Sequence, residues 1–449
     1  MATRWHRRDF LKTSAVLGTG SLLAGATATR NHGGAEHVMT EFAAAPVDPV
    51  RVGFVGIGKR GSYLVRTLLA LERVEVRAVC DIVEDRVAQA QQWVVEAGQA
   101  KPAGYAGTET VFRDLCEQED LDLVINAAPW EWHVPICVAA MQAGKHTFTE
   151  VPAAVTEDEC WQLIETAERT RRHCVMMENC CYFRNAMMVL SMVRKGLLGR
   201  LIHCEAGYQH YRIANNVFDA EGNLLWCGEH EARRDGNLYP THPVGPVGQW
   251  MNINRGDQFD YLVSMSGKSL GLNIYAAEHF GPDHPLATRE YALGDINTTL
   301  IRTKNGCTIT LYHDTQVPRP YDLIYRAQGT KGLYMGTLDK IYIEGRSKPH
   351  EWEAIDGYLE EYEHPLWKAL AAQAIGHGHG GADFLMLWRF MKCLREGLPM
   401  DSDVYDAAAW SVIAPLSERS VADKSRPIDF PDYTRGTWPQ RPALGIVET

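Results

Sequence analysis

The stretch VRVGFVGIGKRG, residues 50–61, decides the fold of this chain. It begins with a continuous run of apolar and small residues, which is typical of a buried parallel strand. It ends in the spacing Gly56-x-Gly58-x-x-Gly61. Glycines at these positions permit a tight turn, a close approach of the backbone to a ligand, and the start of a helix. The stretch therefore predicts a strand, a glycine-rich turn and a helix.

A carboxylate at the end of the next predicted strand indicates what the turn binds. Residues 74–81 form that strand, and Asp81 lies 20 residues after Gly61. In a dinucleotide site, a pyrophosphate lies at the helix N-terminus and such a carboxylate accepts hydrogen bonds from the ribose hydroxyls. Asp81 would repel a 2′-phosphate, so NAD is the predicted cofactor. Arg60 and Arg86 keep NADP open, and an empty glycine-rich turn is the alternative.

The rest of the first half alternates in the same manner. Predicted helices near 84–97, 130–143 and 157–171 separate predicted strands at 121–129, 146–152 and 174–179. Strands that alternate with helices of 10–15 residues predict a parallel sheet with right-handed crossovers. We expect a Rossmann domain over residues 50–180.

After residue 185 the pattern changes. Segments rich in β-formers, including LGLNIYAAEHF at 270–280, follow one another with Asn-Gly and Lys-Gly turns between some of them. They predict a mostly antiparallel sheet, and two helices near 382–395 and 405–417 close the chain. The predicted fold class is α/β, with an N-terminal Rossmann parallel sheet and a C-terminal α+β domain, residues 181–449, built on a large mostly antiparallel sheet.

The N-terminus differs from everything that follows it. Arg7-Arg8-Asp9-Phe10-Leu11-Lys12 precedes a run of small apolar residues with A-x-A sites up to Ala28. This resembles a twin-arginine export signal; a basic amphipathic helix is the alternative. We expect a signal peptide over residues 1–28, a mobile linker over 29–49, and a periplasmic or secreted protein without a membrane anchor.

Composition narrows the class of partner. A net charge of −11 argues against nucleic acid, which needs a basic surface. No run approaches the roughly 18 apolar residues of a membrane span. The 11 cysteines are odd in number and contain no C-x-x-C, so we expect free, buried thiols in a protein that folds before export.

The stretch GNLYPTHPVGP, residues 236–246, places a phenol and an imidazole three residues apart. Histidine titrates near neutral pH. A phenol acts as a base only beside a positive charge, such as a nicotinamide ring. Tyr239 and His242 are therefore predicted proton carriers on a rigid loop. The alternative is that both side chains hydrogen-bond within a proline-rich loop.

Four motifs in this order resemble a known family. The segment order resembles the glucose-fructose oxidoreductase and inositol dehydrogenase superfamily, whose dehydrogenases carry Glu-Lys-Pro where this chain has EVP at 150–152. Valine cannot exchange a proton, so simple alcohol dehydrogenation loses its usual acid and base. With EVP, the motifs WEWH at 130–133, ENCCY at 178–182 and YPTH at 239–242 resemble glycoside hydrolase family 109. The founding activity of that family is an NAD-dependent α-N-acetylgalactosaminidase.

The resemblance implies roles for individual residues. It implies an NAD site lined by Gly56, Gly58, Arg60, Gly61, Asp81, Trp130, Glu131, Trp132, His133, Glu150, Val151 and Asn179. It implies a sugar site lined by Tyr208, Tyr239, Pro240, Thr241, His242 and Tyr321, with Tyr239 and His242 as the catalytic pair. An arginine is expected 12 residues before that tyrosine, where this chain has Cys227. The sugar and its anomer are therefore left open.

The implied reaction uses NAD without consuming it. NAD⁺ takes a hydride from C3 of the sugar, a base removes the acidified C2 proton, the C1 substituent leaves, water adds, and the hydride returns. We expect release of an N-acetylhexosamine, with α-N-acetylgalactosamine as the first candidate, from a small glycoside or a glycan terminus. An exported NAD(P)-dependent sugar oxidoreductase and a non-catalytic carbohydrate-binding protein are the alternatives. Export favours the glycosidase, because nothing outside the cytoplasm reoxidises NADH.

Two further features carry weaker expectations. The H-x-H of His377 and His379 lacks an acidic or cysteine partner nearby in sequence, so no metal is predicted and a loop beside the active site is preferred. The exposed face of the large predicted sheet indicates a homo-oligomer.

Overall fold

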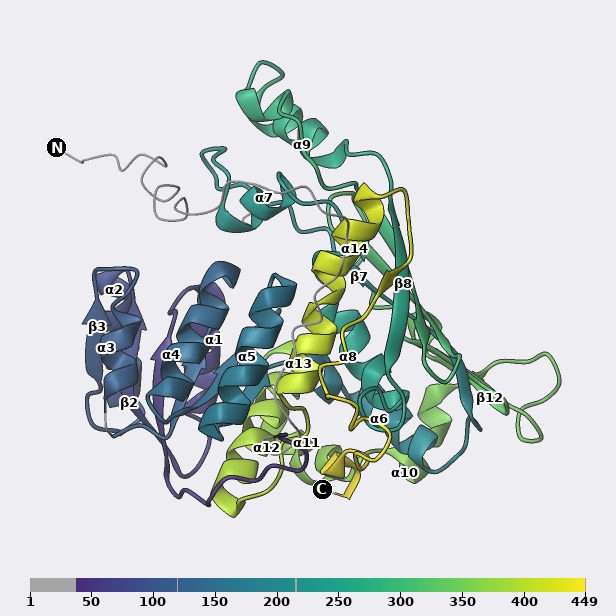
Figure 1. The fold of residues 1–449 in the computed structure, drawn as a ribbon, viewed down its shortest axis with the longest axis horizontal. Helices are drawn as coiled ribbons and strands as arrows, with labels where there is room; N and C mark the ends of the chain where they lie inside the picture. The colour runs from purple at the N-terminus through teal and green to yellow at the C-terminus, as the bar shows by residue number, and fades with distance from the viewer. Residues whose placement is uncertain (1–37, 119, 215, 449) are drawn as a thin grey trace, which may run out of the picture. The chain divides into compact units, whose positions relative to one another are not determined.

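The computed structural model describes residues 38–118, 120–214 and 216–448 of the chain (Figure 1). The predicted signal peptide and the first part of the predicted linker lie outside these residues. The described chain forms one compact unit built on two sheets.

The first sheet is parallel throughout and has the strand order β3-β2-β1-β4-β5-β6. Its inner strands are largely buried, which explains the apolar runs of β1 and β4 in the sequence. The predicted Rossmann sheet is therefore confirmed. The strands are β1 (Val50–Val55), β2 (Val74–Asp81), β3 (Ala103–Ala106), β4 (Leu123–Asn126), β5 (His146–Thr149) and β6 (Cys174–Met176).

Helices connect these strands and cover both faces of the sheet. They are α1 (Lys59–Leu68), α2 (Glu84–Glu96), α3 (Phe112–Glu117), α4 (His133–Gln142) and α5 (Glu157–Thr170). The short elements β3 and α3 were not predicted. The edge strand β3 has no fully buried residue, so no apolar run marks it in the sequence.

The second sheet has nine strands in the order β14-β13-β12-β11-β7-β10-β9-β8-β15. Every neighbouring pair is antiparallel except β7 and β10, which run parallel from His203 beside Thr308 to Gln209 beside Asp314. The prediction of a mostly antiparallel sheet is confirmed. The strands are β7 (Leu201–Gln209), β8 (Phe259–Ser266), β9 (Ile296–Thr303), β10 (Thr308–Asp314), β11 (Arg326–Gly329), β12 (Gly332–Met335), β13 (Lys340–Ile343), β14 (Glu353–Ala354) and β15 (Ile428–Asp429).

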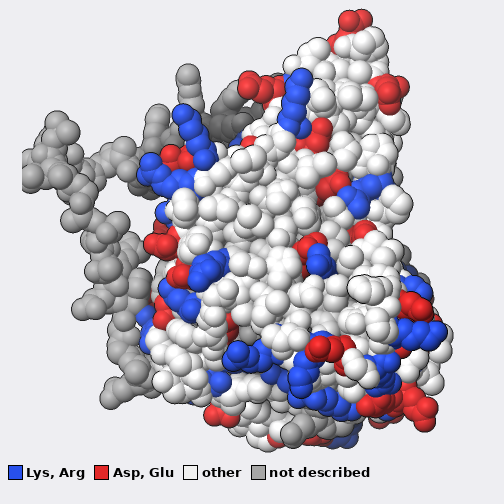
Figure 2. All heavy atoms as spheres, turned by 90° about the vertical axis from the view of Figure 1, so that its right-hand side faces the viewer, with Lys and Arg blue, Asp and Glu red and all other residues white. Residues whose placement is uncertain are grey.

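One face of the second sheet packs against helices and the other is open. The remaining helices are α6 (Arg184–Arg194), α7 (Trp226–Glu231), α8 (Thr241–Trp250), α9 (Gly271–Phe280), α10 (Leu359–Tyr362), α11 (Pro365–Ala374), α12 (Ala382–Glu396), α13 (Val404–Ser411) and α14 (Ile413–Ala422). Along β9, side chains alternate between buried and outward positions, with Ile296 and Leu300 about half exposed. Figure 2 shows the open side, with few charged groups in its middle and many toward its lower edge.

Two expectations about this half are wrong. Residues 270–280 form α9 and not a strand: Leu272 and Ala276, four residues apart, are its buried positions, and Asp295 accepts hydrogen bonds from the amides that begin it. The expected single helix over 405–417 is two helices, α13 and α14. Pro415 stands in the first turn of α14, where it cannot donate to the preceding turn, so the helix restarts there.

Residues 38–49 were expected to be a mobile linker, but they are packed. Met39 is 4 % exposed, and its amide donates to Tyr405 Oη at 2.9 Å. The Val47 amide donates to the carbonyl of Leu394 at 3.1 Å. This segment therefore joins the start of the Rossmann domain to the C-terminal helices.

Helices from the end of the chain pack between the two sheets. Helix α12 contacts α1 and β1, and α13 contacts both α5 and α8. All 11 cysteines lie among the described residues and are free, and all but Cys307 are buried, as expected.

Candidate active site

The glycine-rich turn is shaped by contacts that exclude side chains at two positions and leave space at the third. Gly56 has φ +87°, and a Cβ there would lie 2.6 Å from the backbone of Ala127. A Cβ on Gly61 would lie 1.8 Å from the carbonyl oxygen of Gly56. A Cβ on Gly58 would meet nothing within 4 Å, and no side chain caps α1. The open helix N-terminus beside Gly58 therefore fits a pyrophosphate.

Asp81, the predicted ribose contact, lies beside the glycine-rich turn. Its side chain is largely buried at the end of β2 and accepts hydrogen bonds from the amides of Ile57 at 2.7 Å and Val83 at 2.9 Å. Arg86 approaches it at 3.4 Å from an exposed position. The carboxylate is thus held against the glycine-rich turn by backbone groups.

A hydrogen-bond network links three predicted NAD residues, and its central carboxylate was not identified from the sequence. Asp383, at the start of α12 and fully buried, accepts from both terminal nitrogens of Arg60, at 2.7 and 2.9 Å, and from Asn179 Nδ2 at 2.8 Å. Arg60 Nε also donates to Glu150 at 2.7 Å. The network therefore fixes the turn, the end of β5 and the segment after β6 to the C-terminal helices.

His379 completes this network, and the expectation that it has no acidic partner nearby in sequence is wrong, because Asp383 lies four residues further along the chain. Its Nδ1 lies 2.8 Å from Asp383 Oδ2. Burial alone would raise the pKa of Asp383, but the hydrogen bonds from His379 and Arg60 outweigh it and hold this pKa below its ordinary value. The loop with His377 and His379 thus lies beside the candidate cofactor site. His377 instead packs its ring against Phe384.

The residues of the WEWH segment, 130–133, differ in their surroundings, and not all of them face the candidate site. The His133 imidazole is buried between the carbonyl oxygens of Pro152, at 2.6 Å, and Ala128, at 2.8 Å, so it braces the backbone. The Trp132 ring meets Phe112, and Glu131 is half exposed, 3.7 Å from His230. Val151 lies buried behind Glu150.

Trp130 is where the predicted cofactor and sugar residues meet. Its ring centroid lies 5.8 Å from that of Tyr239, 5.4 Å from that of Trp226 and 4.9 Å from that of His230. Tyr239 in turn stacks on Tyr208, with centroids 4.3 Å apart and planes 20° from parallel. The structure therefore brings one residue of the predicted NAD set into contact with the predicted sugar set.

His242 is held by a buried carboxylate. Its Nδ1 lies 2.7 Å from Oε1 of Glu178, which is 2 % exposed and also accepts from the amide of Cys180. An ionised carboxylate only accepts, so Nδ1 carries the proton and Nε2 is left with a lone pair. Glu178 follows β6, 64 residues before His242, and the sequence did not single it out as a partner.

The tyrosine beside His242 is a neutral phenol. The two ring centroids lie 5.0 Å apart. Burial raises the pKa of Tyr239 well above its ordinary value, and Arg212 counters this only in part. At neutral pH, the Tyr239 hydroxyl is therefore a donor.

The stretch 236–246 was expected to be a rigid loop, but α8 begins within it. Pro240 lies at the helix N-cap, Thr241 is the first helical residue, and His242 stands in the first turn. Thr241 is fully buried, and no hydrogen-bond partner of its Oγ1 is present among the described residues. Tyr325 Oη donates to the carbonyl of His242 at 2.7 Å, which fixes this turn further.

Tyr321 forms the outer rim of the predicted sugar site. It is about half exposed, and its ring meets that of His210 at 4.9 Å. His210 Nδ1 lies 3.2 Å from Tyr208 Oη. His210 therefore links the rim to the stacked tyrosines, a role that nothing in its own sequence context indicated.

One cluster of the described residues has metal-ligating groups close together. Ligand atoms of Glu178, Cys180 and His242 lie within 4.8 Å of one another. Burial raises the pKa of Cys180 well above its ordinary value, which disfavours the thiolate that binds metals. The His242 nitrogen nearest Glu178 already donates to it. The chemistry of these groups favours a hydrogen-bonded pair.

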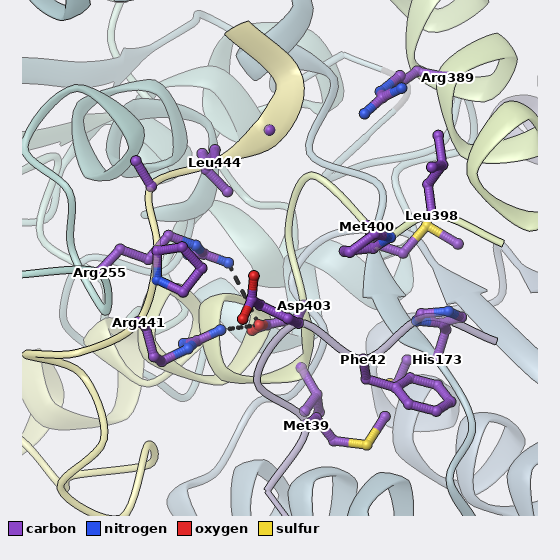
Figure 3. Close-up of a pocket in the computed structure, with 17 residues that line it drawn as sticks. Met39, Phe42, His173, Arg255, Arg389, Leu398, Met400, Asp403, Arg441 and Leu444 are labelled. Atoms are coloured by element: carbon purple, nitrogen blue, oxygen red, sulfur yellow. Dashed lines mark hydrogen bonds and ion pairs between the residues drawn. The ribbon is translucent and has the colours of Figure 1, made fainter. Parts of the chain in front are cut away.

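The cavity drawn in Figure 3 lies elsewhere, and none of the predicted site residues lines it. It has a volume of about 310 Å³ and lies between the packed segment at Met39 and the tail at Leu444. Arg255 and Arg441, at its wall, both pair with Asp403. The candidate active site is therefore defined by the contacts among its side chains, and this cavity is not part of it.

Comparisons with known proteins identify the family. Residues 182–440 match the model "Glycosyl hydrolase 109, C-terminal domain", and residues 50–178 match "Oxidoreductase family, NAD-binding Rossmann fold". A "Glycosyl hydrolase family 109 protein" from Shewanella pealeana is 45% identical over 458 residues, 99% of both chains. A relative of the same name from Shewanella putrefaciens is 44% identical over 455 residues, 98% of this chain and 99% of its own.

The chain belongs to glycosyl hydrolase family 109. Family 109 membership and the match of residues 50–178 make the N-terminal domain an NAD-binding Rossmann domain and NAD the cofactor. The family resemblance expected from the four motifs is thereby confirmed.

Solved structures show the same fold for this family 109 chain. A levoglucosan dehydrogenase in complex with NADH and L-sorbose superimposes with a TM-score of 0.67 at 18% identity, covering 86% of this chain and 100% of its own. An inositol dehydrogenase homolog from Azotobacter vinelandii, in complex with NADH and myo-inositol, gives 0.61 at 18% identity, with 87% and 99% covered. Across the described residues, no helix is long and apolar enough to cross a membrane.

Proposed function

We propose that this family 109 protein is an exported, NAD-dependent glycosidase that releases an N-acetylhexosamine, with α-N-acetylgalactosamine as the first candidate. The observation that carries the proposal is the pair formed by His242 and Glu178 at 2.7 Å, next to Tyr239 and close to Trp130 of the NAD-binding domain. A proton acceptor and a neutral proton donor stand together where a sugar would meet the cofactor.

The cofactor and the side chains have separate tasks in this proposal. When bound, NAD would supply a reversible hydride acceptor for C3 of the sugar, which makes the C2 proton acidic. His242 Nε2 then takes the C2 proton, and Glu178 stabilises the resulting imidazolium. General base assistance of this kind accelerates a step by about 10²- to 10⁴-fold.

Tyr239 supports the same step as a donor. Because its pKa is raised by burial, the phenol keeps its proton and can donate to the oxygen on C3, where negative charge develops as the C2 proton leaves. The electron pair from C2 expels the substituent at C1, whose oxygen takes a proton from solvent; the later addition of water at C1 returns a proton to solvent. Tyr208 holds the Tyr239 ring by stacking on it. Water then adds at C1, and His242 returns its proton to C2.

A panel of aryl glycosides that differ in sugar and anomer, incubated in D₂O, tests the proposal. A glycosidase of this type releases the aglycone without net NADH and leaves deuterium at C2 of the product. Net NADH without aglycone would instead identify a sugar oxidoreductase, and neither signal would identify a binding protein.

The His242→Ala variant tests the assigned base. We expect turnover to fall by about 10²-fold or more while NAD stays bound, because the imidazole makes no hydrogen bond to the glycine-rich turn. His279→Ala, an exposed histidine in α9, is the matched control and keeps full activity. Loss of NAD from the His242 variant would contradict the assignment.

We also propose export by the twin-arginine route, which rests on the sequence of residues 1–28 alone. Replacing Arg7 and Arg8 by lysine should retain the protein in the cytoplasm of a bacterium that exports it. N-terminal sequencing of the exported protein should begin after the A-x-A sites. An unprocessed N-terminus outside the cytoplasm would contradict the signal peptide.

A homo-oligomer through the open face of the second sheet is the proposed assembly. Met265, Ile296 and Leu300 are each between 46% and 65% exposed on this face, and few charges lie in its middle (Figure 2). Apolar surface of this kind marks association sites. Leu300→Arg should lower the mass measured by light scattering, and an unchanged mass would exclude this face.

A further inference from the structure

Arg212 stands beside the two stacked tyrosines of the candidate active site. It follows β7, and its amide donates to the carbonyl of Thr315 at 3.2 Å. The centre of its guanidinium lies 5.6 Å from the ring centroid of Tyr239 and 5.9 Å from that of Tyr208. The positive group therefore belongs to the wall that we propose faces the sugar.

The guanidinium is unusual because its contacts are weak and neutral. One terminal nitrogen lies 3.4 Å from Tyr208 Oη and the other 3.8 Å from Cys227 Sγ. Burial raises the pKa of Tyr208, and it raises that of Cys227 to about 12, so both partners are uncharged at neutral pH. A guanidinium has five N–H donors, and these two contacts leave most of them unused.

Three arginines with little exposed surface pair with carboxylates. Arg60 pairs with Asp383 at 2.7 Å, Arg255 with Asp406 at 2.7 Å and Arg389 with Asp401 at 2.9 Å. For Arg212, no carboxylate oxygen within 4 Å is found among residues 38–118, 120–214 and 216–448. Arg212 is partly buried, and charges withdrawn from water are normally paired, so the missing partner points to an acceptor that arrives with the substrate.

Glu231, a buried acidic residue that interacts electrostatically with Arg212, does not fill this role. Burial raises the pKa of Glu231, which favours its neutral form, although Arg212 counters the effect in part. Gln316 Nε2 donates to Glu231 Oε2 at 3.1 Å. Glu231 is thus engaged by another side chain and stands beyond ion-pair distance of the guanidinium.

We propose that Arg212 is the specificity-determining residue of the sugar site, where its fork donates to a planar acceptor group on the substrate. Two groups share this chemistry, the carbonyl of an acetamido substituent and the carboxylate of a hexuronate. The inference rests on the proposed function, since it assumes a sugar beside Tyr208 and Tyr239. It also accounts for Cys227: the expected arginine is absent there, and Arg212 brings a guanidinium to that thiol from a different element.

The test compares three aryl glycosides of one anomer: the N-acetylhexosaminide, the hexuronide and the plain hexoside. In the NAD-loaded wild type, one acceptor-bearing substrate should have the highest kcat/KM, and which one it is identifies the acceptor. Arg212→Gln should lower kcat/KM for that substrate by about 10- to 100-fold and change the plain hexoside by less than about threefold. Arg212→Lys keeps the charge but loses the fork, so it should give an intermediate preference.

Arg233→Gln is the matched control, because Arg233 is an exposed arginine that pairs with Glu229 on α7. It should retain the wild-type preference, and NAD content and melting temperature show whether each variant folds. An equal loss on all three substrates, or no preference in the wild type, overturns the role of Arg212 while the glycosidase stands.

If the wild type cleaves none of the glycosides, the proposed function fails and binding decides the role of Arg212. Calorimetric titration of the free N-acetylhexosamine, hexuronate and hexose into the NAD-loaded protein should then show a preference that Arg212→Gln removes. A preference that survives the substitution, or no preference at all, rejects the inference.

Discussion

His242 and Glu178 form a pair whose geometry sets the direction of proton transfer. The 2.7 Å contact fixes the protonated nitrogen of the imidazole on the side of the carboxylate. Glu178 is held in turn by the amide of Cys180, so it cannot turn toward the sugar without losing that bond. It acts through His242 as a positioning residue.

Glu178→Gln tests this arrangement. The amide keeps the size of the side chain but loses its charge, so the imidazolium formed during the reaction is less stable. We expect kcat to fall by about 10- to 100-fold, with KM and bound NAD little changed. Steady-state kinetics and the absorbance of released cofactor measure both.

Glu278→Gln, an exposed position in α9, is the control for that variant. A fall in kcat/KM that comes entirely from KM would show that Glu178 shapes the sugar site and not the base.

At the residue scale, the sequence predicted site residues that are marked by their neighbours in the chain. It did not predict residues whose partners lie far away in the chain. Tyr239 and His242 could be chosen because two titratable groups stand three residues apart beside prolines. Glu178 could not be paired with His242, because nothing in its own segment marks a partner 64 residues away. Asp383 lies 323 residues from Arg60, and only the packing of α12 against α1 brings them together.

The glycine-rich turn between β1 and α1 offers a test in which two similar substitutions have different effects. Gly58→Ala adds a methyl group where the protein leaves open space, so stability should change by less than about 1 kcal/mol. The same methyl group would block the approach of a pyrophosphate to the backbone. NAD affinity should therefore fall by about 10-fold or more, as measured by calorimetry.

Gly56→Ala should act in the opposite manner. Its φ of +87° and the 2.6 Å approach to the Ala127 backbone make a side chain strained. The positive φ alone costs about 1–3 kcal/mol, and unfolding in urea measures the loss. If Gly58→Ala bound NAD normally, the pyrophosphate would have to lie elsewhere.

Strands and helices could be predicted where buried positions produce a regular pattern of apolar residues in the sequence. The strands β1 and β4 are buried on both faces and appear as largely apolar runs, whereas β2 carries Glu75 and the exposed Arg77 before its buried end. The prediction for α9 was wrong because only Leu272 and Ala276 are buried in this helix. Two buried positions give too weak a helical period among residues that favour β-strands. The break between α13 and α14 coincides with Pro415, which interrupts the helical pattern over residues 405–417.

The whole molecule contains buried histidines that should make it sensitive to acid. His146 and His173 are 3% and 4% exposed, with ring centroids 5.0 Å apart. Burial lowers the pKa of His146 to about 4 and that of His173 to about 3. Burial also lowers the pKa of His313 to about 3 and that of His364 to about 4.

The sign of the effect follows from proton linkage. Below pH about 6.5 the unfolded chain binds protons that the folded chain excludes until its own lower pKa is reached, so the free energy of unfolding falls with pH. At pH 5, each of these histidines costs about 2 kcal/mol relative to pH 7.

Urea unfolding between pH 7 and pH 5 measures this slope. His173→Phe keeps the ring packing against Phe42 and should reduce the slope by about one proton. His279→Ala removes an exposed histidine and should leave the slope unchanged. A flat profile for the wild type would mean that the buried imidazoles take up protons in the folded state.

The bond between Arg60 and Asp383 has a consequence for how the chain becomes functional. A ribosome completes the six strands of the first sheet long before it reaches α12, so the nascent domain has its glycine-rich turn and the bond from Arg60 to Glu150 but not the carboxylate of Asp383. The same holds for a truncated fragment of residues 50–180, in which Arg60 and Asn179 would lack their shared acceptor, Asp383. We therefore expect the fragment to bind NAD more weakly than the full chain, because two residues of the candidate cofactor site lose the carboxylate that holds them.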